Sequence, residues 1–445
     1  MYVVRRLQEA GYAAFLVGGC VRDIYLGSLP HDWDVATDAR PEAVRRLFPR
    51  THDVGARFGT VGVIPPEAAR DEAVGSVEVT TFRKDLGYQD GRRPTQVSFG
   101  ASIEEDLARR DFTMNAVAWN PAAGAVVDPF HGLSDIEAGL IRAVGDPTVR
   151  FREDALRMLR AVRFSSQLGF TIDPDTWTAI EREAHRVQQL SSERIRDELL
   201  RLLETDRAGE GLWVLHELGL MRYCLPELQG TFRMAQGKPG APTLLAHLIQ
   251  TVDACPPDPV LRLAALFHDV GKLTTRAVTP EGRVIFHGHE KASAEVALRA
   301  CRRLRMPKRE TCHIVELVRM HMVFGEEVGK KAVRRWVAAN GEDWVRDLIL
   351  LRRADHVASG GDPGDNPFAD RLERLLDEVV AEGSAFTVRD LAIGGREVMA
   401  ATGLAPGPKV GEVLQRLLER VLEAPELNEE KRLIELAREI AAELD

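Results

Sequence analysis

Two short segments near the start of the chain constrain its fold more than any other feature. Residues 15–23 read Phe-Leu-Val-Gly-Gly-Cys-Val-Arg-Asp, and residues 31–35 read His-Asp-Trp-Asp-Val. This order predicts a strand, a glycine turn, a helix and a second strand that carries two aspartates. Because residues two apart in a strand point to the same face, we expect Asp32 and Asp34 to project side by side, as a pair of divalent metal ions requires.

The two glycines of the first segment form the turn. Gly18 and Gly19 follow the predicted strand and open the next helix. A glycine lets the backbone approach a phosphate closely, and a helix N-terminus favours an anion. A phosphate site beside a two-carboxylate metal site predicts the transfer of a nucleotidyl group.

Length and charge narrow the class of protein. A chain of 445 residues exceeds what one core supports, so we expect roughly two to four domains. The net charge of −9 argues against a uniformly basic nucleic-acid binder and still allows a local basic surface. The five cysteines are scattered, and neither a secretory signal nor a membrane-spanning run is seen. We therefore expect a cytoplasmic protein with no membrane contact.

The hydrophobic pattern separates an N-terminal part with strands from a longer helical part. Up to about residue 145, short apolar runs alternate with helical stretches, which predicts an α/β unit. The candidate strands are residues 14–17, 33–36, 60–64, 77–81 and 116–119. From residue 148 onward the periodicity is helical, and Gln229–Pro242 is rich in Gly and Pro, which predicts a linker.

Further motifs follow the first two segments in order along the chain. They are Val77–Arg83 (VEVTTFR), Tyr88–Pro94 (YQDGRRP), Arg109–Ala116 (RRDFTMNA), Asp128–Asp135 (DPFHGLSD) and Arg152–Arg160 (REDALRMLR). In this order they resemble the class II tRNA nucleotidyltransferases, the bacterial CCA-adding enzyme and poly(A) polymerase family. That family belongs to the polymerase-beta-like superfamily, and the resemblance implies a polymerase-beta-like head.

The resemblance implies that the acidic residues of the head hold metal. Asp32 and Asp34 would bind two Mg²⁺ ions, one beside the primer 3′-hydroxyl and one beside the triphosphate. Glu78 lies on a neighbouring predicted strand. It either supplies a third carboxylate or forms a salt bridge at a strand edge.

The resemblance also assigns the residues around the nucleotide. Gly18, Gly19 and Arg22 would hold the β- and γ-phosphates through backbone amides and a guanidinium. Arg110 and Asp111 would contact the ribose and its 2′-hydroxyl, which favours ribonucleotides.

The motif that contains Glu153, Asp154, Arg157 and Arg160 points to the base. Asp154 and Arg157 are three apart on a predicted helix, so we expect them to share a face. The carboxylate accepts hydrogen bonds and the guanidinium donates them. Together they match the amino donor and ring-nitrogen acceptor of cytosine and adenine, whereas guanine and uracil present the opposite order. An ordinary helix salt bridge is the alternative interpretation.

Residues 84–94 resemble the flexible loop that the family uses to change from C to A addition. The loop is shortened in members that add only C, and here it has full length. The sequence therefore disfavours a CC-only enzyme and leaves an A-only enzyme open.

The second helical part carries a separate set of histidines and aspartates, whose order resembles the HD phosphohydrolase superfamily. The expected metal ligands are His247, His268, Asp269 and Asp355. They would bind one or two divalent ions, such as transition metals, whose bound water hydrolyses phosphate esters. His289 and His321 would be further ligands or phosphate contacts. The segment before the first histidine departs from HD-fused relatives, so an idle metal-binding fold is an alternative.

Together these motifs predict an α+β protein with four parts. They are a polymerase-beta-like nucleotidyltransferase head (1–147), an all-α neck with the base-selecting helix (148–235), an HD-type helical domain (236–365) and a helical, tRNA-binding tail (366–445). The predicted reaction is template-independent addition of C and A from CTP and ATP to the 3′ end of tRNA, with Mg²⁺. The alternatives are an A-only enzyme, a poly(A) polymerase, a metal-dependent phosphohydrolase whose head binds RNA, and a tRNA-binding protein without activity.

Overall fold

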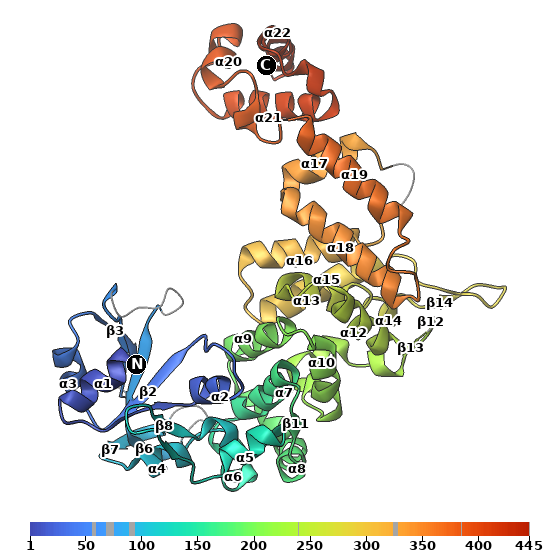
Figure 1. Cartoon of the computed structure of the whole chain (residues 1–445). Coiled ribbons are helices and arrows are strands. Elements are labelled where there is room, and N and C mark those ends of the chain that lie inside the picture. Colours follow the sequence, from blue (N-terminus) through green and yellow to red (C-terminus); the bar gives the residue numbers. More distant parts are fainter. Residues whose placement is uncertain are drawn as a thin grey trace. The chain divides into compact units, whose positions relative to one another are not determined.

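The computed structural model describes residues 1–55, 59–67, 75–88, 94–238, 240–323, 328–383 and 385–444. The chain divides into two compact units, residues 1–226 and 227–445 (Figure 1). The predicted boundaries between the four parts stay predictions. Among the described residues, no helix is both long enough and apolar enough to cross a lipid bilayer.

The first unit contains a mixed sheet of seven strands in the order β3-β4-β5-β2-β1-β8-β9. Its strands are β1 (Ala14–Val17), β2 (Trp33–Thr37), β3 (Thr51–Gly55), β4 (Thr60–Val63), β5 (Val77–Thr81), β8 (Ala118–Asn120) and β9 (Ala125–Val127). β2 pairs with β5 in parallel, and the other neighbours in the sheet are antiparallel. The first four predicted strands agree with observed strands to within one residue. The strand predicted at 116–119 begins at Ala118 because Thr113–Asn115 forms a 3₁₀ turn.

Helices cover the sheet and continue beyond it. They are α1 (Tyr2–Glu9), α2 (Gly19–Tyr25), α3 (Pro41–Leu47), α4 (Ile103–Ala108), α5 (Gly132–Glu137), α6 (Pro147–Glu153), α7 (Leu156–Leu168), α8 (Pro174–Glu183), α9 (Ser192–Leu203), α10 (Ala208–Glu217) and α11 (Met221–Cys224). A short parallel pair, β10 (Leu140–Ile141) with β11 (Thr171–Ile172), joins the head to the predicted neck, so that neck is not purely helical. Residues 84–88 and 94 of the predicted flexible loop are strand residues in a hairpin of β6 (Arg83–Tyr88) and β7 (Pro94–Phe99), and its residues 89–93 lie outside the described residues.

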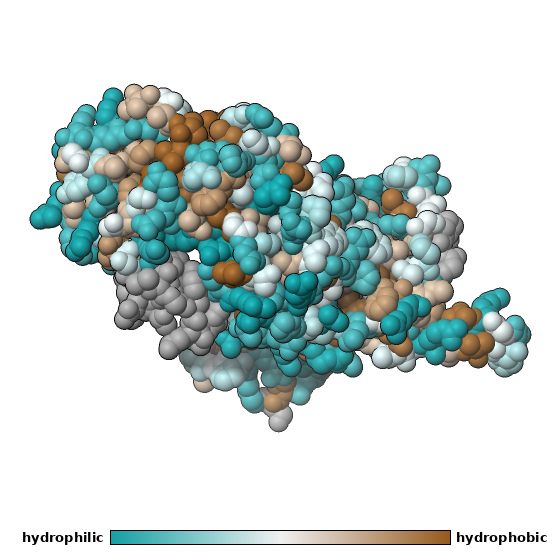
Figure 2. All heavy atoms as spheres, turned by 90° about the horizontal axis from the view of Figure 1, so that it is seen from below, coloured by the Kyte–Doolittle hydropathy of each residue, from teal (hydrophilic) through white to brown (hydrophobic). Residues whose placement is uncertain are grey.

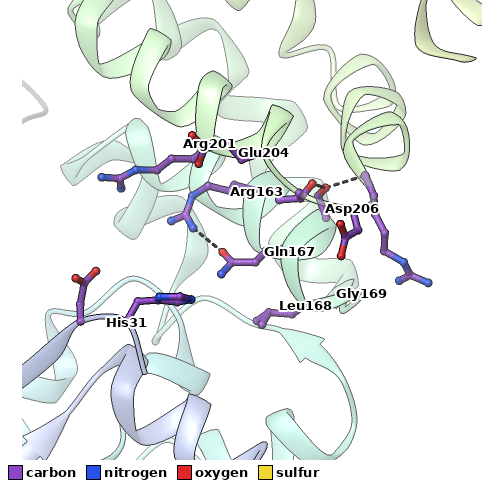
Figure 3. Close-up of a pocket in the computed structure, with 12 residues that line it drawn as sticks. His31, Arg163, Gln167, Leu168, Gly169, Arg201, Glu204 and Asp206 are labelled. Carbon is purple, nitrogen blue, oxygen red and sulfur yellow. Dashed lines mark hydrogen bonds between the residues drawn. The ribbon is translucent and has the colours of Figure 1, made fainter. Parts of the chain in front are cut away.

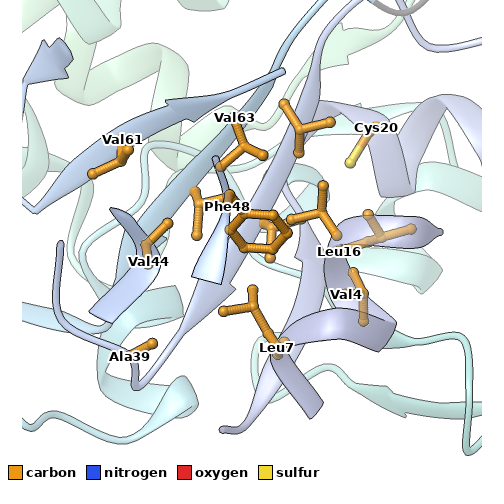
Figure 4. Close-up of a cluster of buried hydrophobic side chains, with 14 of the residues drawn as sticks. Val4, Leu7, Leu16, Cys20, Ala39, Val44, Phe48, Val61 and Val63 are labelled. Carbon is orange, nitrogen blue, oxygen red and sulfur yellow. The ribbon is translucent and has the colours of Figure 1, made fainter. Parts of the chain in front are cut away.

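The two faces of the sheet pack against different helices, and this packing fixes where Asp34 points. Leu16 and Val35 belong to a buried cluster that includes side chains of α1 and α3 (Figure 4). Ala36 belongs to a second cluster that includes Leu107 of α4. Because side chains alternate along a strand, Asp34 shares its face with Ala36 and points away from the α1–α3 cluster.

The second unit is helical, apart from two small hairpins. Its helices are α12 (Leu244–Ala254), α13 (Pro259–Phe267), α14 (Lys272–Thr275), α15 (His289–Arg303), α16 (Lys308–Met320), α17 (Lys330–Asn340), α18 (Glu342–Ala358), α19 (Pro367–Ala381), α20 (Gly395–Thr402), α21 (Pro408–Glu423) and α22 (Glu430–Glu443). The predicted linker at 229–242 is wrong in its central part, where β12 (Ala235–Lys238) pairs with β13 (Ala241–Thr243). The backbone of that segment therefore makes ladder hydrogen bonds.

A second hairpin carries exposed apolar side chains. β14 (Ala277–Val278) pairs with β15 (Val284–Ile285), and Val278 and Val284 are largely exposed. Figure 2 shows apolar residues on this projection, at the right of the view. The last three helices, α20 to α22, share a hydrophobic cluster of their own. The tail therefore has a core separate from the sheet clusters of the first unit.

Candidate functional sites

The predicted glycine turn lies directly beneath two charged side chains. Gly18 is the N-cap of α2 and has a φ of 76°. A Cβ atom at this position would lie 2.8 Å from Nη1 of Arg110 and 3.3 Å from Oδ2 of Asp34. Glycine is required here both by the left-handed backbone and by the close approach of these groups. Nε of Arg110 is buried and makes no hydrogen bond with the described residues.

The three predicted acidic residues line one cavity of about 320 Å³. Sheet register places Asp34 of β2 directly opposite Glu78 of β5. The predicted strand with two aspartates contains only Asp34. Asp32 lies one residue before the start of β2. Gly19 and Arg22 line the same cavity.

The electrostatics of these carboxylates fit a cation. Burial raises the pKa of Asp34, and the negative charge of Asp32 raises it further. Partial burial raises the pKa of Glu78, and Asp34 and Asp32 add to that effect. Divalent cations bind carboxylate oxygens and relieve this kind of repulsion. The residues therefore suit a hard cation such as Mg²⁺.

Arginines reach the cavity while tied to partners of their own. Nη1 of Arg22 donates to Oδ1 of Asn115 at 2.9 Å, and its side chain also pairs with Asp23 at 2.7 Å. Nε of Arg160 donates to Oδ2 of Asp111 at 2.7 Å. Although burial alone would raise it, the pKa of Asp111 is lowered to about 2, chiefly by the Arg160 guanidinium. These arginines are fixed before any anion arrives.

Three arginine side chains lie around the aromatic ring of Phe164, an arrangement that the sequence analysis did not predict. The guanidinium carbons of Arg22, Arg160 and Arg163 lie 5.2, 5.2 and 4.2 Å from the ring centroid. Nε of Arg163 donates to Glu198 at 2.7 Å. The three-residue spacing of arginines along α7 was an available signal for Arg163. Nothing in the sequence placed Arg22 on the same ring.

The base-selecting motif does not lie on one helix, so this part of the prediction is wrong. α6 ends at Glu153, and Asp154 has an extended backbone between α6 and α7. Its carboxylate accepts the Leu156 N–H at 3.0 Å and thereby begins the next helix. Asp154 also pairs with Arg194 at 2.7 Å, and Arg157 pairs with Glu153 at 2.7 Å. The two predicted base-reading groups are held by different partners.

The second unit brings together all six of its singled-out histidines and aspartates. Each of the four imidazoles has Nδ1 against a backbone carbonyl, and a carbonyl can only accept. The contacts are Ala358 to His247 at 3.3 Å, Ala265 to His268 at 2.7 Å, Phe286 to His289 at 2.8 Å and Val318 to His321 at 2.7 Å. Nδ1 therefore carries the proton, and the lone pair of each Nε2 is available to a metal.

The six side chains form two groups that could each hold an ion. His247, His268 and Asp355 make the first, with Nε2–Oδ1 distances of 3.3 and 3.7 Å. The second joins Oδ1 of Asp269 to Nε2 of His289 at 3.1 Å and to Nε2 of His321 at 3.6 Å.

Asp269 belongs to the second group and also lies close to the first. Its Oδ2 lies 3.2 Å from Nε2 of His247, while its Oδ1 faces the second group. Nε2 of His289 and of His321 is buried and makes no hydrogen bond within the described part of the chain. Both nitrogens face Oδ1 of Asp269, and a metal ion between them would be bound by all three groups.

Charge in this cluster is balanced by protons. Although burial alone would lower it, the pKa of His268 is raised to about 9, chiefly by Asp269. The neighbouring histidines hold the pKa of Asp269 well below its ordinary value. Lys272 also contacts Asp269. Because a metal competes with these protons, the donor set fits a divalent transition metal that binds more tightly as pH rises.

Comparisons with known proteins match three regions of the chain. Residues 14–142 match the Poly A polymerase head domain, residues 169–231 the probable RNA and SrmB-binding site of polymerase A, and residues 244–360 the HD domain. A CCA-adding enzyme of Latilactobacillus sakei is 36% identical over 425 residues, covering 96% of this chain and 93% of that protein. The chain belongs to the CCA-adding enzyme family.

Other members of the CCA-adding enzyme family are similar in structure or over part of the chain. The crystal structure of the Bacillus stearothermophilus CCA-adding enzyme in complex with CTP has a TM-score of 0.68 at 30% identity and covers 98% of this chain and 95% of that chain. A CCA-adding enzyme of Geobacillus thermodenitrificans is 50% identical over 226 residues, 51% of this chain and 54% of that protein. The resemblance seen in the sequence is confirmed.

Gly18→Ala should destabilise the protein more than Gly11→Ala. Both glycines have a positive φ, of 76° and 87°, but a Cβ at Gly11 would meet nothing within 4 Å. The extra loss at Gly18 should be about 1–3 kcal/mol, because Arg110 and Asp34 must move. Urea unfolding of the two variants measures this difference, and equal losses would contradict the close approach.

Asp34→Asn should raise the melting temperature of the metal-free protein at pH 7. With a raised pKa, Asp34 holds its proton more tightly in the folded state, so ionisation costs stability as pH rises through the folded-state pKa. The gain should vanish below about pH 4, where the carboxyl is protonated in both states. Mg²⁺ should stabilise the wild type more than the variant. A variant that melts no higher at pH 7 would reject the repulsion among the carboxylates.

Proposed function

We propose that this chain adds C and A nucleotides, one at a time and without a template, to the 3′ end of tRNA. CTP and ATP are the substrates, and pyrophosphate leaves. The observation that carries the proposal is the single cavity that Asp32, Asp34, Glu78 and Arg22 line, in a member of the CCA-adding enzyme family. The cytoplasm is the proposed location, and it is supported by five cysteines of which none forms a disulfide.

The acidic residues would hold the metal of this reaction. Asp32 and Asp34, with Glu78 beside them, fit Mg²⁺ because they present clustered carboxylate oxygens. When bound, the metal supplies an activated primer hydroxyl and neutralises the charge of the triphosphate. The backbone amides at Gly18 and Gly19 and the guanidinium of Arg22, which reaches the same cavity, would bind phosphate oxygens.

The remaining motif residues would orient the nucleoside. Asp111 is fixed as an ionised acceptor by Arg160, which suits a ribose hydroxyl. Arg157 and Asp154 would read the amino and ring-nitrogen positions that cytosine and adenine share. Glu153 holds Arg157 and Arg194 holds Asp154, so the distance between the two reading groups depends on how α6 and α7 meet.

Three primers test the proposed product: tRNA that ends before CCA, after one C, and after CC. With CTP, ATP and Mg²⁺, the wild type should complete CCA on all three and then stop. Extension of the CC-ended primer alone would favour an A-only enzyme. Continued A addition to unrelated RNA would favour a poly(A) polymerase, and no addition to any primer would reject the proposal.

Asp32→Ala and Asp34→Ala should each lower the rate of nucleotide addition by a factor of about 10³ or more. Each variant removes a metal ligand, and the bound metal stabilises the transition state by several kcal/mol. Glu217→Ala, at an exposed position on α10, is the matched control and should keep wild-type activity. Single-turnover extension of the CC-ended primer measures the effect. Wild-type rates for either aspartate variant would reject the metal assignment.

We propose a second function for the second unit, a metal-dependent phosphohydrolase with two cations. The observation behind it is the pair of ligand groups with Asp269 between them. The bound ions would supply a hydroxide for attack on phosphorus. The imidazoles of His247 and His289 would hold the ions on either side of that carboxylate, with their Nδ1 atoms fixed by backbone carbonyls.

Metal content tests this centre in a chain that carries Asp34→Ala, so that the head contributes little. Elemental analysis after loading with Mn²⁺ should give two ions per chain. His321→Ala should lose one ion, Asp269→Asn should lose both, and His313→Ala, which removes an imidazole that pairs with Asp347 outside the cluster, should keep two. Hydrolysis of bis-p-nitrophenyl phosphate should follow the metal content. Two bound ions without hydrolysis would favour the idle metal-binding fold.

A further inference from the structure

Two arginines of the nucleotide cavity belong to a closed network of side-chain contacts. Nη1 of Arg22 donates to Oδ1 of Asn115 at 2.9 Å, and Nδ2 of Asn115 donates to Oδ1 of Asp111 at 3.2 Å. Oδ2 of Asp111 accepts from Nε of Arg160 at 2.7 Å. The guanidinium carbons of Arg160 and Arg22 each lie 5.2 Å from the centroid of the Phe164 ring, which closes the network. Five side chains from three separate segments of the chain therefore hold one another in place.

Burial limits the movement of this five-residue network. Arg22, Asn115 and Phe164 are each exposed by 5% or less. The Phe164 ring also packs edge to face against Phe112, with 6.0 Å between the ring centroids. An aromatic face attracts a cation more strongly when the pair is removed from water. The position of the Phe164 ring therefore determines where the guanidiniums that contact it lie.

A third arginine attaches the Phe164 ring to α9. The guanidinium carbon of Arg163 lies 4.2 Å from the ring centroid. Its Nη1 donates to Oε1 of Gln167 at 2.9 Å, the contact drawn between these two side chains in Figure 3. Its Nε donates to Glu198 of α9 at 2.7 Å, and both members of this pair are buried. The ring is thus held from the side of α9 by contacts that do not involve a nucleotide.

We propose that Asn115 and Phe164 are positioning residues that couple the binding of the triphosphate to the binding of the ribose. The inference rests on the proposed function, in which Arg22 binds phosphate oxygens and Asp111 accepts a ribose hydroxyl. Asn115 joins these two groups directly, and Phe164 joins them through Arg160. A nucleotide that orders one group therefore orders the other, and this coupling is reciprocal by linkage. The network favours a ligand that carries both a triphosphate and a 2′-hydroxyl.

The test measures the dissociation constants of ATP and dATP for the full chain, with Mg²⁺ and without tRNA. Phe164→Leu keeps an apolar side chain and removes the ring face, so affinity should fall roughly fivefold for ATP and only about twofold for dATP. Phe164→Tyr keeps the ring face and should restore both constants. The matched control is Phe48→Leu, which shortens a buried phenylalanine of the α1–α3 cluster (Figure 4). It should leave the preference for ATP over dATP unchanged.

Asn115 gives an independent arm of the test. Asn115→Ala should also lower the preference for ATP over dATP, because it separates Arg22 from Asp111. Since the two links run in parallel, the double variant with Phe164→Leu should lose more preference than the product of the two single losses. Equal losses of ATP and dATP affinity in either single variant, or a double variant at that product, would overturn the inference. Failure of the proposed function is distinct, because a wild type that extends no primer would still give these binding constants.

Discussion

The parallel pairing of β2 with β5 is the constraint on which the catalytic cavity depends. Its register sets Asp34 directly opposite Glu78. The backbone pairing therefore keeps the two carboxylates close together despite their like charges. The buried cluster behind β2 holds that register, since a slip of one residue would send Val35 into the cavity and Asp34 into the core. Packing energy in the sheet thus keeps like charges together that would otherwise separate.

The arginines of the cavity are held in place by side-chain contacts rather than by sheet register. Arg22, Arg160 and Arg163 each have a polar or acidic partner of their own and a common ring, Phe164. Those partners keep the guanidiniums from collapsing onto Asp34, so both signs of charge persist within one cavity. Such a site needs little rearrangement when a cation and a triphosphate arrive, which is how preorganised charge favours a reaction.

Local patterns predicted the parts of this site that depend on neighbours in sequence. Period-two alternation located β2, and the paired glycines located the turn with its positive φ at Gly18. The break between α6 and α7 was missed because the spacing of Asp154 from Arg157 fits one continuous helix, whereas the backbone at Asp154 is extended and its carboxylate accepts the Leu156 N–H. The position of Arg22, Arg160 and Arg163 around the ring of Phe164 depends on tertiary contacts, which sequence spacing does not encode.

Both proposed metal sites place carboxylates close together, but the pKa values of these carboxylates shift in opposite directions in the two sites. In the head, carboxylates crowd one another and their pKa values rise, because burial and mutual repulsion outweigh the nearby cations, Arg110 for Asp34 and His52 for Glu78. In the HD unit, buried carboxylates are balanced by imidazoles, and their pKa values fall. Clustered carboxylate oxygens suit a hard cation such as Mg²⁺, whereas buried imidazole nitrogens suit a transition metal. The ligand chemistry of the two sites therefore fits two different kinds of divalent cation.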